Sequence, residues 1–243
     1  MIAVGLSIAR FTILCLCPAC PILSKEALMA ADYRKTTATS YDTVAADYAD
    51  RFQHEMSYKP FDRKMLELLV ERVGEMGTIC DMGCGPGQIA AYLHHLGATA
   101  CGIDLSAQMV TEAKKLYPDI DFQQGDMLDL HKIADSTFAG IAAFYSLIHI
   151  QKPDLPKALS ELFRILMPDG RLMLTYHVGE EVRHIDSFFD KPVDLDFIFF
   201  ETADMLPLLQ QAGFIMEEVI ERGPYPEESQ TRRAYLIARK PAP

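Results

Sequence analysis

Residues 78–87 read Thr-Ile-Cys-Asp-Met-Gly-Cys-Gly-Pro-Gly, a short apolar run that passes directly into alternating glycines. The run from Ile79 to Met82 is typical of a buried parallel strand. Gly83, Gly85 and Gly87 let the backbone turn sharply and let a ligand approach it closely. A helix predicted over residues 89–96 follows, and its first N–H groups are free to bind a polar ligand. This segment therefore predicts a strand, a ligand-binding turn and a helix.

The same alternation of strand and helix continues on both sides of that segment. Further strands are predicted over residues 98–103, 120–124, 138–146 and 171–178, with helices over residues 36–52, 60–73, 108–117 and 155–166. This order predicts an α/β fold, a mostly parallel, doubly wound sheet with helices on both faces. Two strands over residues 214–221 and 233–240 follow a helix over residues 201–211. Since no helix separates these two strands, they are predicted to form an antiparallel pair at the sheet edge.

Length and composition limit the classes of protein that remain. The chain has 243 residues, 49% of them hydrophobic, which suits a single globular domain over residues 31–243. Residues 1–30 are predicted to be a poorly ordered leader that is not part of the native domain, because Pro18 and Pro21 interrupt the apolar stretch that a signal or a membrane span would need. Neither a membrane nor a metal site is expected, and isolated cysteines in strand-like runs fit the reducing cytoplasm.

The net charge argues against nucleic acid as a partner. Lys and Arg number 23 and Asp and Glu number 34, which gives a formal charge of −11. An acidic body repels phosphate backbones, and no run of basic residues offsets this repulsion. A small-molecule partner is therefore expected.

Carboxylates stand where the second and third predicted strands end. In an open α/β sheet, ligands bind beyond the carboxyl ends of the strands. Asp104 can accept hydrogen bonds from both hydroxyls of a ribose, and Asp126 is placed to bind an adenine amino group. Leu105, Met109 and Met127 could enclose the flat base with apolar surface.

These motifs, in this order, resemble the class I S-adenosylmethionine (SAM)-dependent methyltransferases that act on small molecules, and the type 11 group among them. The resemblance covers residues 36–240. It rests on Asp81–Gly87, Gly102–Asp104, Gly125–Met127, the strand end at residues 142–150, and the stretch 162–174 with Pro168-Asp169-Gly170. It implies a seven-stranded sheet in the order 3-2-1-4-5-7-6 with only strand 7 antiparallel, and SAM as the cofactor.

The resemblance also assigns residues to the cofactor. Asp81 is expected to meet the ammonium of the methionine moiety, and Tyr41, on the first helix, to cover the cofactor. Among Phe144, Tyr145 and Ser146, the strand phase is open, so any of the three could touch it. The complete set of expected cofactor contacts is Tyr41, Asp81, Gly83, Cys84, Gly85, Gly87, Asp104, Leu105, Met109, Asp126, Met127, Phe144 and Tyr145.

Two histidines are candidates for a catalytic base. Methyl transfer is an in-line displacement, so a base is needed only when the acceptor must lose a proton. His149 follows the fourth strand and His177 ends the fifth, and either imidazole could take that proton. A structural role for each, with no base at all, is the alternative.

Residues 179–200 form an insertion that should carry information on the acceptor. Phe188 and Phe189 lie among acidic residues there, which favours a partly apolar lid over the acceptor; a packed cover or a homodimer contact is the alternative. Arg232 and Arg233 could bind an acidic acceptor or pair with Glu227 and Glu228.

Two other functions remain open from the sequence alone. A nicotinamide-dependent oxidoreductase would need glycine at position 88 to complete the dinucleotide fingerprint, and that position is Gln88. A non-catalytic partner subunit would bind the cofactor without transferring a methyl group.

Overall fold

The computed structural model describes residues 25–226 and 228–242, with side chains described from residue 33 onward. Most of the predicted leader, together with Glu227, lies outside the described residues. The first described element, α1 (Lys25–Phe52), begins eleven residues before the predicted start at Thr36. A separate α2 (Pro60–Val73) begins at Pro60, where the fixed φ of proline suits a first helical turn.

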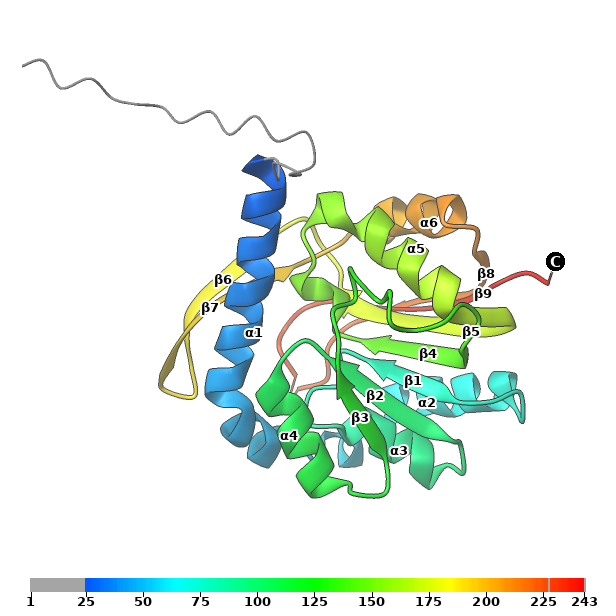
Figure 1. The fold of residues 1–243 in the computed structure, drawn as a ribbon, viewed down its shortest axis with the longest axis horizontal. Coiled ribbons are helices and arrows are strands. Elements are labelled where there is room, and N and C mark those ends of the chain that lie inside the picture. Colours follow the sequence, from blue (N-terminus) through cyan, green and yellow to red (C-terminus); the bar gives the residue numbers. More distant parts are fainter. Residues whose placement is uncertain (1–24, 227, 243) are drawn as a thin grey trace, which may run out of the picture.

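A seven-stranded sheet forms the centre of the molecule (Figure 1). Its strands are β1 (Ile79–Met82), β2 (Ala100–Asp104), β3 (Asp121–Gln124), β4 (Phe138–Phe144), β5 (Leu166–His177), β8 (Ile215–Arg222) and β9 (Arg233–Arg239). Their order is β3-β2-β1-β4-β5-β9-β8, and only β9 runs antiparallel to its neighbours. This confirms the predicted fold class and strand order.

Helices cover both faces of this sheet. They are α3 (Gln88–His95), α4 (Ala107–Leu116), α5 (Leu155–Ile165) and α6 (Thr202–Gln211), besides α1 and α2. Because side chains alternate along a strand, Ile141 and Ala143 of β4 pack in the cluster that contains α5 and α6, whereas Ala142 packs with α2 and α3. β4 is buried along its whole length, as a central strand must be.

The predicted insertion at residues 179–200 contains a hairpin. β6 (Val182–Phe188) pairs with β7 (Lys191–Ile198) in a separate two-stranded antiparallel sheet. In Figure 1 the hairpin lies alongside α1, beyond the end of the main sheet. The Ser40 hydroxyl is 3.2 Å from the Asp194 carbonyl oxygen and 2.9 Å from the Asp194 amide nitrogen, so α1 and the hairpin are joined directly.

Candidate active site

A cavity of about 420 Å³ opens at the carboxyl ends of the parallel strands. The strand ends and the loops that follow them form its floor, and α1 and the β6–β7 hairpin cover it. One end of the cavity is bounded by Asp104 and Asp126, and the other by Arg233 at the start of β9. The parallel strand order brings these residues together, because β1, β2, β3 and β4 all end at the same edge.

The glycine turn after β1 forms part of the cavity wall. Gly83, Cys84 and Gly85 line the cavity, and the amides of Gly83 and Cys84 donate to the Ile103 carbonyl. Gly83 has a φ of 77°, and a Cβ added there would lie 2.3 Å from the Cβ of Ser146. Gly87 lies behind the wall, where an added Cβ would meet the Phe122 ring at 2.7 Å. The turn therefore needs glycine both for its φ angles and for close packing.

Asp81 lies beneath this turn and is 1% exposed. Its Oδ2 accepts a hydrogen bond from the Ala90 amide in the first turn of α3. Its Oδ1 has no hydrogen-bond partner among the described residues. Burial raises the pKa of this carboxyl well above its usual value. Asp81 thus holds α3 against β1 from behind the wall, and it is not among the residues that line the cavity, although it was predicted to contact the cofactor.

Asp104 is on the cavity wall at the end of β2. Its Oδ2 accepts from the Gly85 amide at 2.8 Å, and its Oδ1 accepts from the Ser106 amide at 2.8 Å. Burial raises the pKa of Asp104 to about 6, although both backbone hydrogen bonds favour the charged form. Each carboxylate oxygen keeps a lone pair beyond the one that its amide uses. Leu105 and Met109 lie beside it on the wall, as predicted.

Asp126 lies on the wall after β3, with Met127 next to it. Its Oδ1 accepts from the Leu128 amide, and its Oδ2 accepts from Arg34 of α1 at 2.5 Å. The Arg34 contact is absent from the sequence prediction, because it joins residues that are 92 positions apart. α1 therefore reaches the part of the cavity wall that follows β3.

The cavity has the polar groups that an adenosyl ligand with an amino-acid arm needs. Ser146 and Gln88 line it, and among the described residues Ser146 Oγ and Gln88 Oε1 are buried without a hydrogen-bond partner. Buried polar atoms without partners are costly, so these atoms mark places where a polar ligand group would bind. Asp104 fits the two ribose hydroxyls, and the apolar side chains around Met127 fit the base. The residues present therefore fit SAM.

β4 ends at Phe144, and Phe144, Tyr145 and Ser146 all line the cavity. Strand alternation does not separate the three, because Tyr145 and Ser146 follow the strand. Tyr145 has a φ of 51°, an uncommon conformation for a residue with a side chain. Its amide donates to Thr175 Oγ1, and its hydroxyl lies 3.3 Å from that of Tyr235. These contacts hold the Tyr145 ring in the cavity despite the backbone strain.

His149 joins α1 to the β6–β7 hairpin. Its Nδ1 is 2.9 Å from the Asp196 carbonyl oxygen, which can only accept, so Nδ1 carries the proton. Its Nε2 then accepts from the Tyr41 hydroxyl at 2.7 Å. Burial lowers the pKa of His149 to about 4. Both ring nitrogens are thus occupied in a neutral imidazole, which is the geometry of a structural histidine.

His177 differs, because only one of its nitrogens has a protein partner among the described residues. Its Nδ1 is 2.8 Å from Thr231 Oγ1, and its ring stacks on Phe199 and contacts Tyr145. Burial, together with the positive charges of Arg233, Arg183 and Lys59, lowers its pKa to about 4. His177 lines the cavity as a neutral group and remains a candidate to contact the acceptor.

Aromatic side chains make up a large part of the cavity wall. Tyr48, Phe52, Phe144, Tyr145, Phe188 and Phe197 line the cavity. The Tyr48 ring is edge-on to Phe188 at 6.1 Å, and Lys191 forms an ion pair with Asp47 at 2.5 Å. Phe189 stacks on Phe188 outside the wall. Among the described residues, no group of three or more His, Cys, Asp or Glu side chains could hold a metal ion.

Sequence reasoning missed the polar residues that α1 and its following turn bring to the wall. These are Arg34, Glu55 and Lys59. For Glu55 and Lys59 the sequence offers one local signal, because opposite charges four residues apart can form an ion pair. From the sequence, Gln88 was considered only because the dinucleotide fingerprint would need glycine at that position, and not as a cavity residue.

A doubly wound sheet with this strand order, a glycine turn after β1 and an acid at the end of β2 define a class I SAM-dependent methyltransferase. Residues 79–170 match the family model described as a methyltransferase domain. This part of the chain, from β1 to the middle of β5, is therefore a methyltransferase domain, and the protein is an enzyme of that class with SAM as its cofactor.

Relatives named as methyltransferases agree with this assignment. The chain is 30% identical over 135 residues to a malonyl-[acyl-carrier protein] O-methyltransferase of Enterobacter lignolyticus, covering 54% of this chain and 52% of the relative. It is 34% identical over 137 residues to a ubiquinone/menaquinone biosynthesis C-methyltransferase of Desulfotalea psychrophila, covering 54% of each. These two matches span about half the length of each relative.

The fold also matches solved structures. One is the 1,6-didemethyltoxoflavin-N1-methyltransferase of Burkholderia thailandensis, solved with its acceptor and S-adenosylhomocysteine (SAH) bound. The TM-score is 0.67 at 18% identity, and the match covers 87% of this chain and 90% of the other. At this identity the match shows the fold alone.

Proposed function

We propose that the protein transfers a methyl group from SAM to a small planar acceptor bound against the aromatic part of the cavity wall. The observation that carries this proposal is the cavity's composition, which joins polar groups fit for SAM to a wall rich in aromatic side chains. Flat, apolar ligands are bound well by such walls. The quinone and didemethyltoxoflavin methyltransferases among the similar proteins support an acceptor of this kind.

Bound SAM supplies an electrophilic methyl group on a positive sulfur. The task of the protein is to orient the acceptor and to exclude water. The Gly83 turn and Asp104 would hold the nucleoside, and Ser146 and Gln88 would bind the amino-acid arm. Tyr145 and Phe188 would face the acceptor from opposite sides, which agrees with the predicted lid role of residues 179–200.

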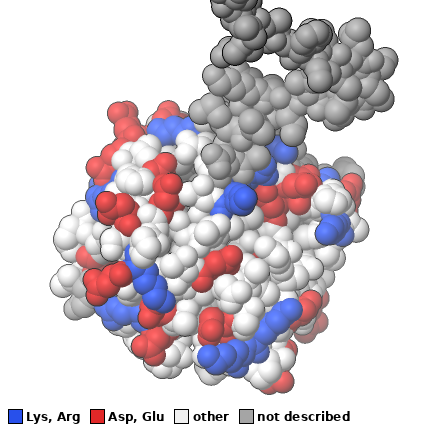
Figure 2. Space-filling view, turned by 60° about the vertical axis from the view of Figure 1, so that its left-hand side comes forward, with Lys and Arg blue, Asp and Glu red and all other residues white. Residues whose placement is uncertain are grey.

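The surface favours a small acceptor over nucleic acid. On the face shown in Figure 2, acidic and basic side chains are interspersed and neither kind gathers into a broad patch. The net charge of −11 adds a general repulsion of phosphate backbones. Within the described part of the chain, no helix combines the length and the apolar character that crossing a membrane requires.

We also propose that the enzyme works in the cytoplasm. The three cysteines of the described chain are free thiols, with Cys80 and Cys84 buried and Cys101 half-buried, and reduced thiols suit a reducing compartment.

A product assay tests the proposed activity. The protein is incubated with SAM and a panel of planar phenols, quinols, heteroaromatic amines and aromatic acids, and SAH release is measured. Phe188→Ala should raise the acceptor KM at least about tenfold, because it removes a wall of the acceptor site, while the Kd for SAH changes little. Val182→Ala, at an exposed position of the same hairpin, is the matched control. An unchanged KM in Phe188→Ala would remove the hairpin from the acceptor site, and no SAH release with any acceptor would favour a non-catalytic subunit.

A further inference from the structure

One part of the cavity wall is formed by residues of the β8–β9 connection, by the first residue of β9 and by the residue just before α2. Arg233, Glu228, Ser229 and Lys59 line it. Arg233 pairs with His177 in the β5–β9 ladder, so these two side chains start from adjacent positions. The Lys59 ammonium lies 5.9 Å from the centre of the Tyr145 ring, and that ring lies 5.1 Å from the His177 ring. Lys59, His177 and Arg233 therefore surround one end of the cavity.

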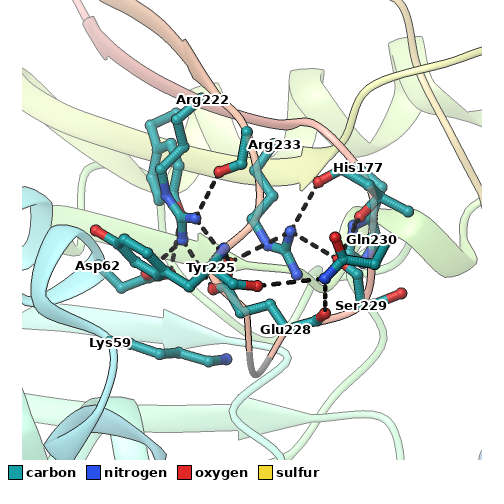
Figure 3. Close-up of polar contacts among 12 residues, drawn as sticks. Lys59, Asp62, His177, Arg222, Tyr225, Glu228, Ser229, Gln230 and Arg233 are labelled. Atoms are coloured by element: carbon teal, nitrogen blue, oxygen red, sulfur yellow. Dashed lines mark hydrogen bonds and ion pairs between the residues drawn. The ribbon is translucent and has the colours of Figure 1, made fainter.

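Glu228 is held by other residues and is not free to bind a ligand. Its Oε2 accepts from Arg222 at 2.7 Å and from the Tyr225 amide at 2.8 Å, and its Oε1 accepts from Arg222 at 2.9 Å (Figure 3). Burial opposes its charge, but the hydrogen bonds from Arg222 and Tyr225 lower the pKa of Glu228 to about 2. Arg222 also donates to Asp62, which is fully buried. Arg222 thus satisfies both of these carboxylates.

Glu55, the other carboxylate here, is paired with Lys59 and accepts one hydrogen bond on each oxygen. Its Oε1 accepts from Gln88 at 2.8 Å and its Oε2 accepts from Lys59 at 2.5 Å. A cationic acceptor would therefore find no carboxylate oxygen without a partner at this end of the cavity.

The two cations on the wall still have unused donors. Lys59 carries three N–H groups, and the described residues receive one hydrogen bond from it. Arg233 donates from one terminal nitrogen to the carbonyls of Ser229 and Thr231, and that nitrogen is 3.4 Å from Glu228. Its other terminal nitrogen has no partner among the described residues. Arg233 is only 5% exposed, so these donors are not satisfied by bulk water.

We propose that the methyl acceptor is a small planar organic acid, bound as its anion by Lys59 and Arg233. The formal charges of the surrounding ion pairs cancel. Lys59 and Arg233 nevertheless keep N–H groups that no described residue accepts, whereas each nearby carboxylate is already paired with a cation. An anionic oxygen, from a carboxylate or from an ionised enol or phenol, satisfies those donors with charge-assisted hydrogen bonds. The aromatic walls bind its planar part. This inference rests on the proposed methyltransferase function.

An anionic acceptor also agrees with the state of the two histidines. An acceptor that binds already ionised has no proton to lose when the new bond to the methyl carbon forms. The electron pair for that bond comes from the anion, and the pair of the broken sulfur–carbon bond stays on sulfur, which becomes neutral. No base is then required, which suits two imidazoles whose pKa values lie near 4.

Ligand binding to the SAH-loaded protein tests this proposal. Calorimetry compares two matched pairs of probes, 2-hydroxybenzoate against 2-hydroxybenzamide, and 4-hydroxycoumarin against coumarin. We expect at least one acid to bind tenfold or more tightly than its neutral partner. If only 2-hydroxybenzoate is preferred, the anionic group is a carboxylate; if only 4-hydroxycoumarin, it is an enolate. Equal binding within both pairs, or no binding of either acid, overturns the proposal.

Variants identify the residues that bind the anion. Lys59→Gln and Arg233→Gln should each lower the affinity for the preferred acid tenfold or more and leave the neutral partner nearly unchanged. Lys64→Gln and Arg232→Gln are matched controls, because these cations are exposed and do not line the cavity. Arg233→Lys keeps the positive charge and should retain most of the affinity for the acid. This result would show that Arg233→Gln loses affinity because the charge is gone and not because the protein misfolds.

SAH binding separates this proposal from the one on which it rests. A protein that fails to bind SAH contradicts the methyltransferase function itself. Two outcomes contradict only the proposal of an anionic acceptor. In the first, the protein binds SAH but binds the acids no more tightly than their neutral partners. In the second, the Lys59→Gln and Arg233→Gln variants bind the acids as the wild type does.

Discussion

Replacing Asp104 with alanine should remove most of the affinity for SAH. In the protein, each oxygen of Asp104 accepts one backbone amide and keeps a lone pair for a ribose hydroxyl. A hydrogen bond to a charged group contributes about 1.5–3 kcal/mol, so two of them contribute about 3–6 kcal/mol. Since about 1.4 kcal/mol is a tenfold change in Kd, Asp104→Ala should weaken SAH binding at least about 100-fold.

Isothermal titration calorimetry measures this loss, with thermal unfolding as the check on the fold. Loss of the bonds to the Gly85 and Ser106 amides should also lower the unfolding free energy by about 1–3 kcal/mol. Asp121→Asn, at the exposed start of the neighbouring β3, is the control and should bind SAH normally. The pKa of Asp104, about 6, adds a second expectation: in the wild type, SAH affinity should fall as the pH drops below 6. A folded Asp104→Ala protein with less than a fivefold loss would refute the ribose assignment.

Three further predictions concern the turn and the histidines. Gly83→Ala places a Cβ 2.3 Å from that of Ser146 at a φ of 77°, so it should abolish measurable SAH binding and lower the melting temperature, and a normal Kd would contradict the close packing. Tyr41→Phe removes the hydrogen bond to His149 and should cost about 1 kcal/mol of unfolding free energy in urea titrations, whereas no loss would mean that the bond is not formed in solution. For His177 the pKa falls from 6.5 to about 4 on folding, so the unfolded state binds more protons between these values and stability falls as the pH is lowered through them. His177→Gln should reduce that slope by up to about 1.4 kcal/mol per pH unit, and an unchanged slope in denaturant titrations at several pH values would contradict the lowered pKa.

The sheet could be predicted from the sequence because its signals are local. The central strands are short apolar runs next to a glycine, proline or carboxylate, whereas β3 reads Asp-Phe-Gln-Gln with only Phe122 buried. The helix stripe from Leu155 to Ile165 has the period of one buried face. The strand order came from the resemblance, since apolar runs carry no information on which strand lies beside which. Likewise, the ends of β1 and β2 identified the glycine turn and Asp104.

The β6–β7 hairpin could not be predicted as strands from its residues. Its two-residue turn is Phe189-Asp190, and both residues have positive φ, 52° and 58°. A turn of this kind is normally signalled by Asn-Gly or Asp-Gly, and Phe-Asp gives no such signal. The insertion was therefore recognisable as a cover over the site, but not as a hairpin attached to α1.

Contacts between distant segments were also beyond the sequence. The bond of His149 to both Tyr41 and Asp196 depends on α1 and β7 meeting above the sheet. The same is true of the pair of Arg34 with Asp126. In each case the residue type was visible, but its partner is set by tertiary packing, so the sequence could not show that both ring nitrogens of His149 are occupied.

A crystal structure of the protein with SAH bound tests the central claim most directly. We predict the ribose hydroxyls within hydrogen-bond distance of Asp104, the base beside Met127, and the sulfur directed toward the Tyr145 end of the cavity. Density for SAH anywhere else, or a ribose turned away from Asp104 into solvent, would contradict the account.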